Sequence, residues 1–185
     1  MIIIGITWTL WAGKWAVVDY VTQKYGFQYF SCRAFLIEKI EDEGWEVNRD
    51  TMKIMADSLR AKYGSGYLAD ELYTRAEEGG QNAILESIRA VGEVDLLREK
   101  GHFFLFSVDA DPKTRYSRIC SRANETDHIG YEKFLSDEQR EFANEDPTQG
   151  NIKRCMELAD FTFDNNGTLD QLKKQIDEAM TKIIH

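Results

Sequence analysis

A glycine–lysine pair, Gly13-Lys14, stands between a short apolar run at 1–4 and a helical pattern that starts at Val17. This order of buried strand, loop and helix is that of a phosphate-binding loop, whose backbone N–H groups converge on an anion at the helix N-terminus. A chance Gly-Lys pair is the alternative, since the dipeptide alone is common. The surrounding layout favours the loop, and it limits the chain to folds with a strand–loop–helix unit near the N-terminus.

Four residues of this loop, Trp8, Trp11, Trp15 and Ala16, differ from what phosphate binding needs. The motif places its first glycine at position 8 and the Mg²⁺-binding hydroxyl at 15 or 16. Glycine adopts positive φ cheaply and lets an anion approach the backbone, whereas a tryptophan in the left-handed region costs about 1–2 kcal/mol. The indole rings would also crowd the anion. The sequence therefore predicts a phosphate loop whose anion binding is impaired.

Three of the chain's four tryptophans fall in this loop. On a continuous helix their spacing would form one apolar face, and the rings would be ordinary core. In a loop that enters a helix, we expect the rings to fill the vacated phosphate cavity instead. The other interpretation is an aromatic pocket or surface for a planar ligand, a partner protein or a second copy of the chain.

Composition limits the remaining possibilities. A chain of 185 residues, 43% hydrophobic and 30% charged, fits one globular domain over 1–185. The net charge of -9 argues against nucleic acid as a partner, because phosphate backbones need basic surfaces. No apolar run approaches the ~20 residues of a membrane span, so no membrane partner is expected. Three scattered cysteines, without pairing or metal-ligand spacing, indicate reduced thiols, a cytoplasmic location and no metal site.

Strand and helix patterns alternate along the chain, which predicts an α/β fold with a doubly wound, five-stranded parallel sheet flanked by helices. Ligands of such sheets bind at the carboxyl ends of the strands, so the polar residues that follow each strand are candidates for the site. The predicted strands cover about 1–4, 27–30, 82–86, 102–108 and 161–163. The predicted helices cover about 17–25, 33–43, 50–62, 67–78, 91–100, 113–145 and 168–184.

Several groups of polar and charged residues, most of them at or just after these strand ends, occur in an ordered series along the chain. They are Gly13-Lys14, the segment 48–64 with Arg60, Glu86-Ser87-Ile88-Arg89, Asp109-Ala110-Asp111-Pro112 followed by Arg115, Arg118 and Arg122, and Asn165-Asn166-Gly167-Thr168. Over nearly its whole length the chain thereby resembles the P-loop nucleoside-monophosphate-kinase-like family, near adenylate kinase, dephospho-coenzyme A kinase and the phage-type deoxynucleoside monophosphate kinases. The resemblance implies a helical acceptor-binding segment at about 32–78 and a lid at about 113–150.

The same resemblance implies a small-molecule or nucleotide kinase that transfers the γ-phosphoryl group of ATP, with Mg²⁺, to a phosphorylated acceptor similar to a nucleoside monophosphate. The family has glycine or another small residue where Trp8, Trp11 and Trp15 stand, which favours an engineered or deliberately disabled loop. The alternative class of function is therefore a non-catalytic kinase fold whose aromatic loop binds a ligand or a protein, with self-association through the tryptophans as one form of it.

Individual roles also follow from the resemblance. Lys14 would bridge the β- and γ-phosphates, and forked guanidinium groups would hold the remaining phosphate charge. The implied catalytic residues are Lys14, Arg89, Arg118 and Arg122; the ATP-binding residues are Gly13, Lys14, Arg115, Asn165, Gly167 and Thr168; the acceptor-binding residues are Arg33, Arg60 and Glu86.

Each of these assignments has a structural alternative. The lid arginines share one helix face, at i, i+3 and i+7, so a solvated basic stripe would have the same pattern. Arg33 and Arg60 could be ordinary surface residues. Glu86 and Arg89 could form an internal ion pair. The acceptor itself is not specified by any of these residues.

Overall fold

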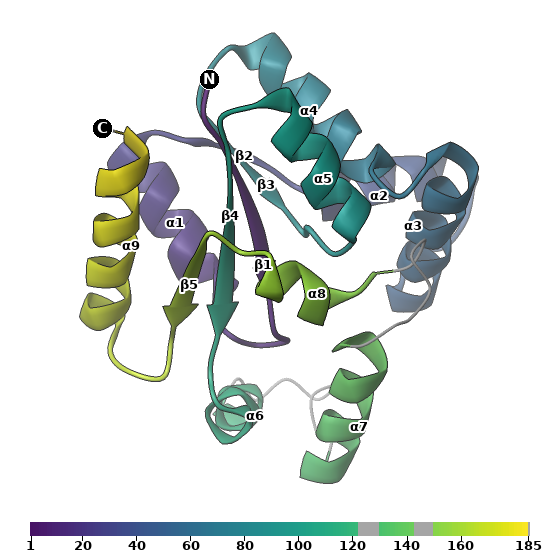
Figure 1. Ribbon diagram of the computed structural model, residues 1–185. Helices are drawn as coiled ribbons and strands as arrows, with labels where there is room; N and C mark the ends of the chain where they lie inside the picture. Colours follow the sequence, from purple (N-terminus) through teal and green to yellow (C-terminus); the bar gives the residue numbers. More distant parts are fainter. Residues whose placement is uncertain (122–129, 143–149, 185) are drawn as a thin grey trace.

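The computed structural model describes residues 1–121, 130–142 and 150–184. Within these residues it contains a five-stranded, fully parallel sheet in the order β2-β3-β1-β4-β5 (Figure 1). The strands are β1 (Ile3–Trp8), β2 (Gln28–Phe30), β3 (Ala83–Glu86), β4 (Phe103–Asp109) and β5 (Phe161–Asp164). The predicted α/β fold class is confirmed.

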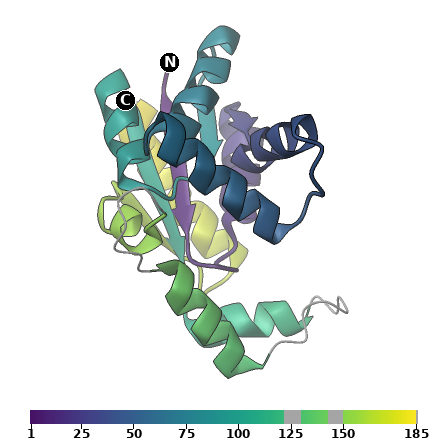
Figure 2. The ribbon, with the colours of Figure 1, turned by 90° about the vertical axis from the view of Figure 1, so that its right-hand side faces the viewer.

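Two apolar cores, one on each face of the sheet, hold the layers together. Successive side chains of a strand point to opposite faces, so Ile3 and Ile4 belong to different cores. Figures 1 and 2 show the helices on both sides of the sheet. One face carries α1 (Lys14–Tyr25) and α9 (Leu169–Ile184), and the other core includes residues of α2 (Cys32–Asp42), α3 (Arg49–Tyr63), α4 (Tyr67–Gly79), α5 (Val91–Lys100) and α8 (Ile152–Glu157).

The first strand is longer than its apolar run suggests, and this moves one tryptophan out of the loop. β1 pairs with β4 from Ile3 to Trp8. Because Ile6 and Thr7 suit a pleated, central position, pairing extends the strand beyond position 4. The prediction that Trp8 lies in the loop is therefore wrong, and the tryptophan with a positive φ, of 67°, is Trp11. The helix α1 also begins earlier than predicted, at Lys14, so the prediction that Trp15 and Ala16 lie in the loop is wrong as well.

The described residues of the segment predicted as a lid form two helices. α6 (Pro112–Ser121) begins at a proline, whose missing N–H costs nothing in a first turn. α7 (Tyr131–Phe142) packs against α6 and α8, and both lid helices lie beyond the carboxyl end of β4 (Figures 1 and 2). Arg122 lies outside the described residues. The short helix α8 is not predicted from the sequence, although Asn151 caps it by accepting a hydrogen bond from the Arg154 N–H (2.9 Å).

The predicted acceptor-binding segment comprises α2, α3 and α4. The side chain of Asn48 caps α3 by accepting from the Thr51 N–H (2.9 Å), and the Thr51 hydroxyl accepts from the Asn48 N–H (3.0 Å). α4 packs on β2 and β3, which anchors this segment to the sheet. Among the described residues, no helix combines the length and apolar composition that crossing a bilayer requires.

Candidate functional site

The loop between β1 and α1, residues 9–13, is tied to β4 at its start and contains two residues with positive φ. The Thr9 N–H donates to the Val108 carbonyl (3.2 Å), and the Thr9 hydroxyl donates to the Asp109 carboxylate (2.5 Å). Trp11 and Gly13 adopt φ values of 67° and 90°. Glycine does so cheaply, whereas the left-handed backbone costs a tryptophan about 1–2 kcal/mol. The loop therefore holds backbone strain at Trp11.

Gly13 packs against the turn that follows β5. The side-chain Nδ2 of Asn165 donates to the Ala12 carbonyl (2.7 Å), and a Cβ added at Gly13 would stand 2.3 Å from that nitrogen. Two of the implied ATP-binding residues, Gly13 and Asn165, are thus brought together. Gly167 and Thr168 lie further along the turn, where Thr168 forms hydrogen bonds with the first turn of α9.

The Lys14 ammonium is enclosed by the chain's own side chains. Its Nζ lies 4.4 Å from the centroid of the Trp8 ring and 4.1 Å from that of Trp15, within the range of cation–π contacts. The same nitrogen forms an ion pair with the Glu86 carboxylate. Lys14 is 7% exposed and Glu86 is 5% exposed, so the pair is buried. The lysine that a phosphate loop directs at an anion here faces two indoles and a carboxylate.

Glu86 is fixed by residues at the end of β2. Its second oxygen accepts hydrogen bonds from the hydroxyls of Tyr29 (2.7 Å) and Ser31 (3.1 Å). Burial alone would raise the pKa of Glu86, but the Lys14 charge and the hydrogen bonds outweigh burial and lower that pKa. Burial lowers the pKa of Lys14 by more than the Glu86 charge raises it. Glu86 is therefore a carboxylate at neutral pH.

Arg115 reaches from α6 to the loop. Its Nε donates to the Ala110 carbonyl (2.7 Å), and its Nη1 donates to the Leu10 carbonyl (3.2 Å). Nη1 also pairs with the Glu138 carboxylate of α7. This side chain is buried and links the loop to both lid helices, so it is not part of a solvated stripe.

Arg118 lies one turn further along α6 and contacts the same loop. Its Nη2 donates to the Asn165 carbonyl (2.6 Å), and its Nη1 approaches the Ala12 carbonyl (3.4 Å). The alternative of a basic stripe in solvent is therefore wrong for Arg118 as well. Arg118 also lies beside Gly13, because a Cβ added at Gly13 would stand 3.8 Å from its Nη1.

A second carboxylate, Glu93, organises the predicted acceptor side. Arg60 is 5% exposed and donates through Nε and Nη2 to one oxygen of Glu93 (3.1 and 2.8 Å). The other oxygen accepts from the backbone N–H groups of Arg89 (2.8 Å) and Ala90 (3.1 Å) at the start of α5. Arg60 is therefore not a surface residue, and its partner Glu93 also holds the backbone of Arg89.

The remaining acceptor-side residues lie at the edge of this cluster. The Arg89 guanidinium carbon is 5.0 Å from the centroid of the Trp8 ring. The ion pair of Glu86 is with Lys14, which replaces the predicted alternative of a Glu86–Arg89 pair. Arg33 is exposed in the first turn of α2.

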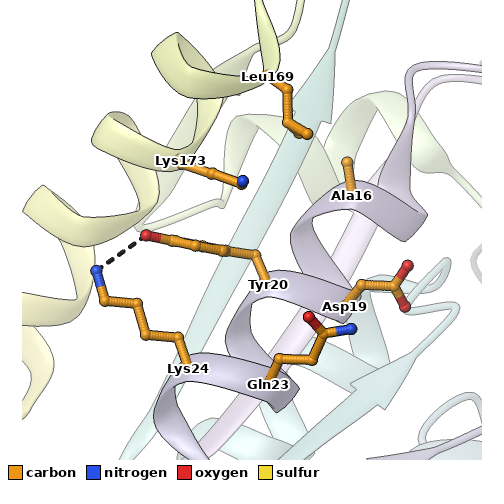
Figure 3. A pocket seen from close by; sticks show the side chains of 7 residues that line it. All are labelled: Ala16, Asp19, Tyr20, Gln23, Lys24, Leu169 and Lys173. Carbon is orange, nitrogen blue, oxygen red and sulfur yellow. Dashed lines mark hydrogen bonds between the residues drawn. The ribbon is translucent and has the colours of Figure 1, made fainter.

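Ala16 lines a hollow between α1 and α9 (Figure 3). Within it the Tyr20 hydroxyl accepts from the Lys24 ammonium (2.9 Å), and both groups bond to Asp177. Of the predicted site residues, Ala16 alone is in its lining, so this hollow is separate from the Lys14 cluster. It has a volume of about 630 Å³ and is lined by Ala16, Asp19, Tyr20, Gln23, Lys24, Leu169 and Lys173.

The loop as it stands does not fit a magnesium–nucleotide complex. Ala16 has no side-chain oxygen at the position where a phosphate loop supplies one, and the lysine that would meet the phosphates is enclosed. In the described part of the chain, no group of three or more His, Cys, Asp or Glu side chains is arranged to hold a metal ion.

The residues that hold the charged side chains in place are not predicted from the sequence. Tyr29 anchors Glu86, Glu93 holds Arg60, and Glu138 pairs with Arg115. One signal was present for Tyr29, because a hydroxyl near the end of β2 must lie at the same sheet edge as the end of β3. Glu93 and Glu138 lie within charged helices, where no local pattern separates a buried carboxylate from an exposed one.

No protein-family model matches the chain. The chain is 26% identical over 188 residues to a UPF0200 protein of Methanocaldococcus jannaschii, an alignment that covers 100% of this chain and 92% of that protein. It is 28% identical over 185 residues to a UPF0200 protein of Methanothermobacter thermautotrophicus, with coverage of 99% and 91%. The similarity to these archaeal proteins therefore extends along the whole chain.

Several solved kinases share this architecture. A shikimate kinase from Bacteroides thetaiotaomicron matches with a TM-score of 0.56 at 10% identity, covering 100% of this chain and 99% of that one. A sugar kinase from Janibacter sp. HTCC2649 gives 0.54 at 14% identity, with coverage of 98% and 93%. A dephospho-CoA kinase from Campylobacter jejuni gives 0.51 at 14% identity, with coverage of 98% and 96%. The chain therefore has the fold of the P-loop kinases and is similar in sequence to the UPF0200 proteins.

Proposed function

We propose that this chain is a P-loop kinase scaffold, of the type that transfers the γ-phosphoryl group of ATP to a nucleoside-monophosphate-like acceptor, with ATP binding impaired by its own loop. One observation carries the proposal: the Lys14 ammonium lies between Trp8 and Trp15 and pairs with Glu86. An anion that approached Lys14 would have to displace two indoles and a carboxylate, and each displacement costs binding free energy.

Cations around the loop support a scaffold built for phosphoryl transfer. Arg115 and Arg118 contact loop carbonyls from α6, and Arg89 lies beside Trp8. Guanidinium groups bind phosphate oxygens through paired N–H donors. Several guanidinium groups at one edge of the sheet therefore suit a site that binds both a phosphorylated acceptor and a phosphate donor. Arg60 would have to leave Glu93 to reach a phosphate, so we assign it to positioning α5 and leave direct acceptor contact to Arg33 and Arg89.

A second candidate function rests on the exposure of Trp15. This side chain is 49% exposed and packs against the Tyr29 ring, with centroids 5.4 Å apart. Trp15 and Tyr29 together offer an aromatic surface, and contiguous exposed apolar surface is typical of interaction sites. This favours a non-catalytic kinase fold whose loop binds a ligand, a partner protein or a second copy of the chain.

Calorimetric titration with magnesium–ATP tests the proposal. The chain as it stands is expected to show no binding at micromolar nucleotide, because Lys14 is enclosed and Ala16 offers no hydroxyl. The variant Trp8→Gly, Trp11→Gly, Trp15→Gly, Ala16→Thr is expected to bind at least about 100-fold more tightly, which corresponds to about 2.7 kcal/mol.

The matched control is Trp45→Gly, which removes the exposed tryptophan between α2 and α3 and should leave nucleotide affinity unchanged. Micromolar affinity in the unaltered chain would contradict the proposal, since the rings would then have to leave the loop readily. A restored loop that binds no nucleotide would favour the second candidate function.

A further inference from the structure

We propose that Trp8, Trp15 and Glu86 form a binding site for small organic ammonium ions, here called the tryptophan cage, and that Lys14 is its intramolecular occupant. This inference rests on the same observation as the proposed function, the enclosed position of Lys14. It adds the class of ligand that the tryptophan cage accepts. Where a phosphate loop presents donors to an anion, the residues around this loop present π-faces and a carboxylate, which suit a cation.

The positions of the two indole rings suit an organic ammonium ion. The Lys14 Nζ lies 4.4 Å from one indole centroid and 4.1 Å from the other, so both ring faces contact the same charge. The negative face of an indole attracts ammonium groups, and recognition of alkylated ammonium ions by aromatic cages uses the same contact. Tyr29 supports the outer wall of the cage by packing against Trp15 at 5.4 Å between centroids.

The negative charge of Glu86 also favours a cation in the cage. Glu86 is buried, and Tyr29 and Ser31 hold one of its oxygens, so the other stays directed at the cage when Lys14 is removed. A buried carboxylate that loses its partner carries a large desolvation penalty, which a replacement cation would relieve. Arg89 is the opposing charge, because it lies over the Trp8 ring, but the Glu86 charge raises the pKa of Lys14 by more than the Arg89 charge lowers it.

The tryptophan cage lies close to the surface and suits a small ion. Trp15 is 49% exposed, so one wall of the tryptophan cage borders solvent. The atoms that Lys14→Ala deletes are those of a propylammonium ion, and this ion can therefore restore the lost contacts. Tetramethylammonium tests the same site with a cation that donates no hydrogen bond.

The test is binding of propylammonium chloride and tetramethylammonium chloride to the full chain carrying Lys14→Ala, measured by tryptophan fluorescence and by the thermal unfolding midpoint. Lys14→Ala should bind both ions at millimolar concentration and gain thermal stability from them beyond that given by sodium chloride at equal ionic strength. The unaltered chain should show neither response, because Lys14 fills the cage. Adding Trp15→Ala to Lys14→Ala should weaken binding about five-fold or more, and adding Trp45→Ala should not.

Equal responses in the unaltered chain and in Lys14→Ala would overturn the proposal, and so would binding that survives Trp15→Ala. If Lys14→Ala is poorly folded alone, the ammonium ions should restore cooperative unfolding, and failure to do so also counts against the cage. These outcomes are independent of nucleotide affinity. Binding of magnesium–ATP by the unaltered chain would refute the proposed function. Absence of ammonium binding by Lys14→Ala would refute only the tryptophan cage.

Discussion

Restoring the loop through Trp8→Gly, Trp11→Gly, Trp15→Gly and Ala16→Thr is expected to raise phosphoryl transfer from ATP to a nucleoside monophosphate by about 10³-fold or more. The reason is that the change frees the Lys14 ammonium from its cage, removes the strained backbone at Trp11 and supplies a hydroxyl. Arg89, Arg115 and Arg118 already lie around the loop. Product formation should be measured first with nucleoside monophosphates and then with dephospho-coenzyme A.

The decisive control is Lys14→Met in the restored background, which should remove about 10²–10³-fold of the regained rate because a preorganised cation is lost. Arg89→Ala and Arg118→Ala, each introduced alone into the restored background, should also reduce the regained rate of phosphoryl transfer. Full activity after Lys14→Met would show that the assignment of a phosphate loop is wrong. If the restored chain phosphorylates none of these acceptors, the proposed kinase scaffold is refuted.

Arg60→Ala is expected to lower the free energy of unfolding by about 3–5 kcal/mol, because it leaves a buried carboxylate without its charge partner. Glu93 is 1% exposed, and its two oxygens bind Arg60 on one side and the backbone of Arg89 and Ala90 on the other. Loss of the guanidinium therefore also disturbs the start of α5. Urea denaturation of the full chain measures this difference.

Lys53→Ala serves as the control for Arg60→Ala, because Lys53 is exposed and pairs with Asp57 on the surface of the same helix. Exposed pairs of this kind contribute little, so its stability should hardly change. The double variant Arg60→Ala, Glu93→Ala should lose less than the sum of the two single variants. An Arg60→Ala chain as stable as Lys53→Ala would contradict a structural role and return Arg60 to the acceptor site.

The fold could be predicted because its signals are local and recur along the chain. The apolar run of β4 is followed directly by the polar residues before Pro112, and the spacing in α9 places one apolar face on the sheet. The boundary of β1 could not be predicted, because Gly5 looks like the start of a loop. In the structure Gly5 is central in the strand, and a Cβ there would stand 2.7 Å from the Phe103 ring. Only the packed sheet reveals that reason for a glycine.

The candidate site could be predicted in outline for a topological reason. Parallel strands in this order bring the ends of β1, β3, β4 and β5 to one edge, so Lys14, Glu86 and Asn165 had to lie at that edge of the sheet. Which groups pair was beyond the sequence, since Lys14 could meet solvent, an anion or any carboxylate at that edge. The choice of Glu86 depends on Tyr29 and Ser31, which hold the carboxylate in place. Whether the loop is engineered stays a prediction.

Lys14 is enclosed by Trp8, Trp15 and Glu86, and we expect it to stay enclosed when nucleotide is offered. The most direct test is a proton–carbon NMR spectrum of lysine side chains, with Lys14 assigned by its loss in Lys14→Met, recorded before and after addition of magnesium–ATP. Ring currents from two indoles should place the Lys14 ε-methylene signal upfield of every other lysine, and nucleotide should leave it there. A Lys14 signal at the position of exposed lysines, or one that moves to that position with magnesium–ATP, would contradict the claim.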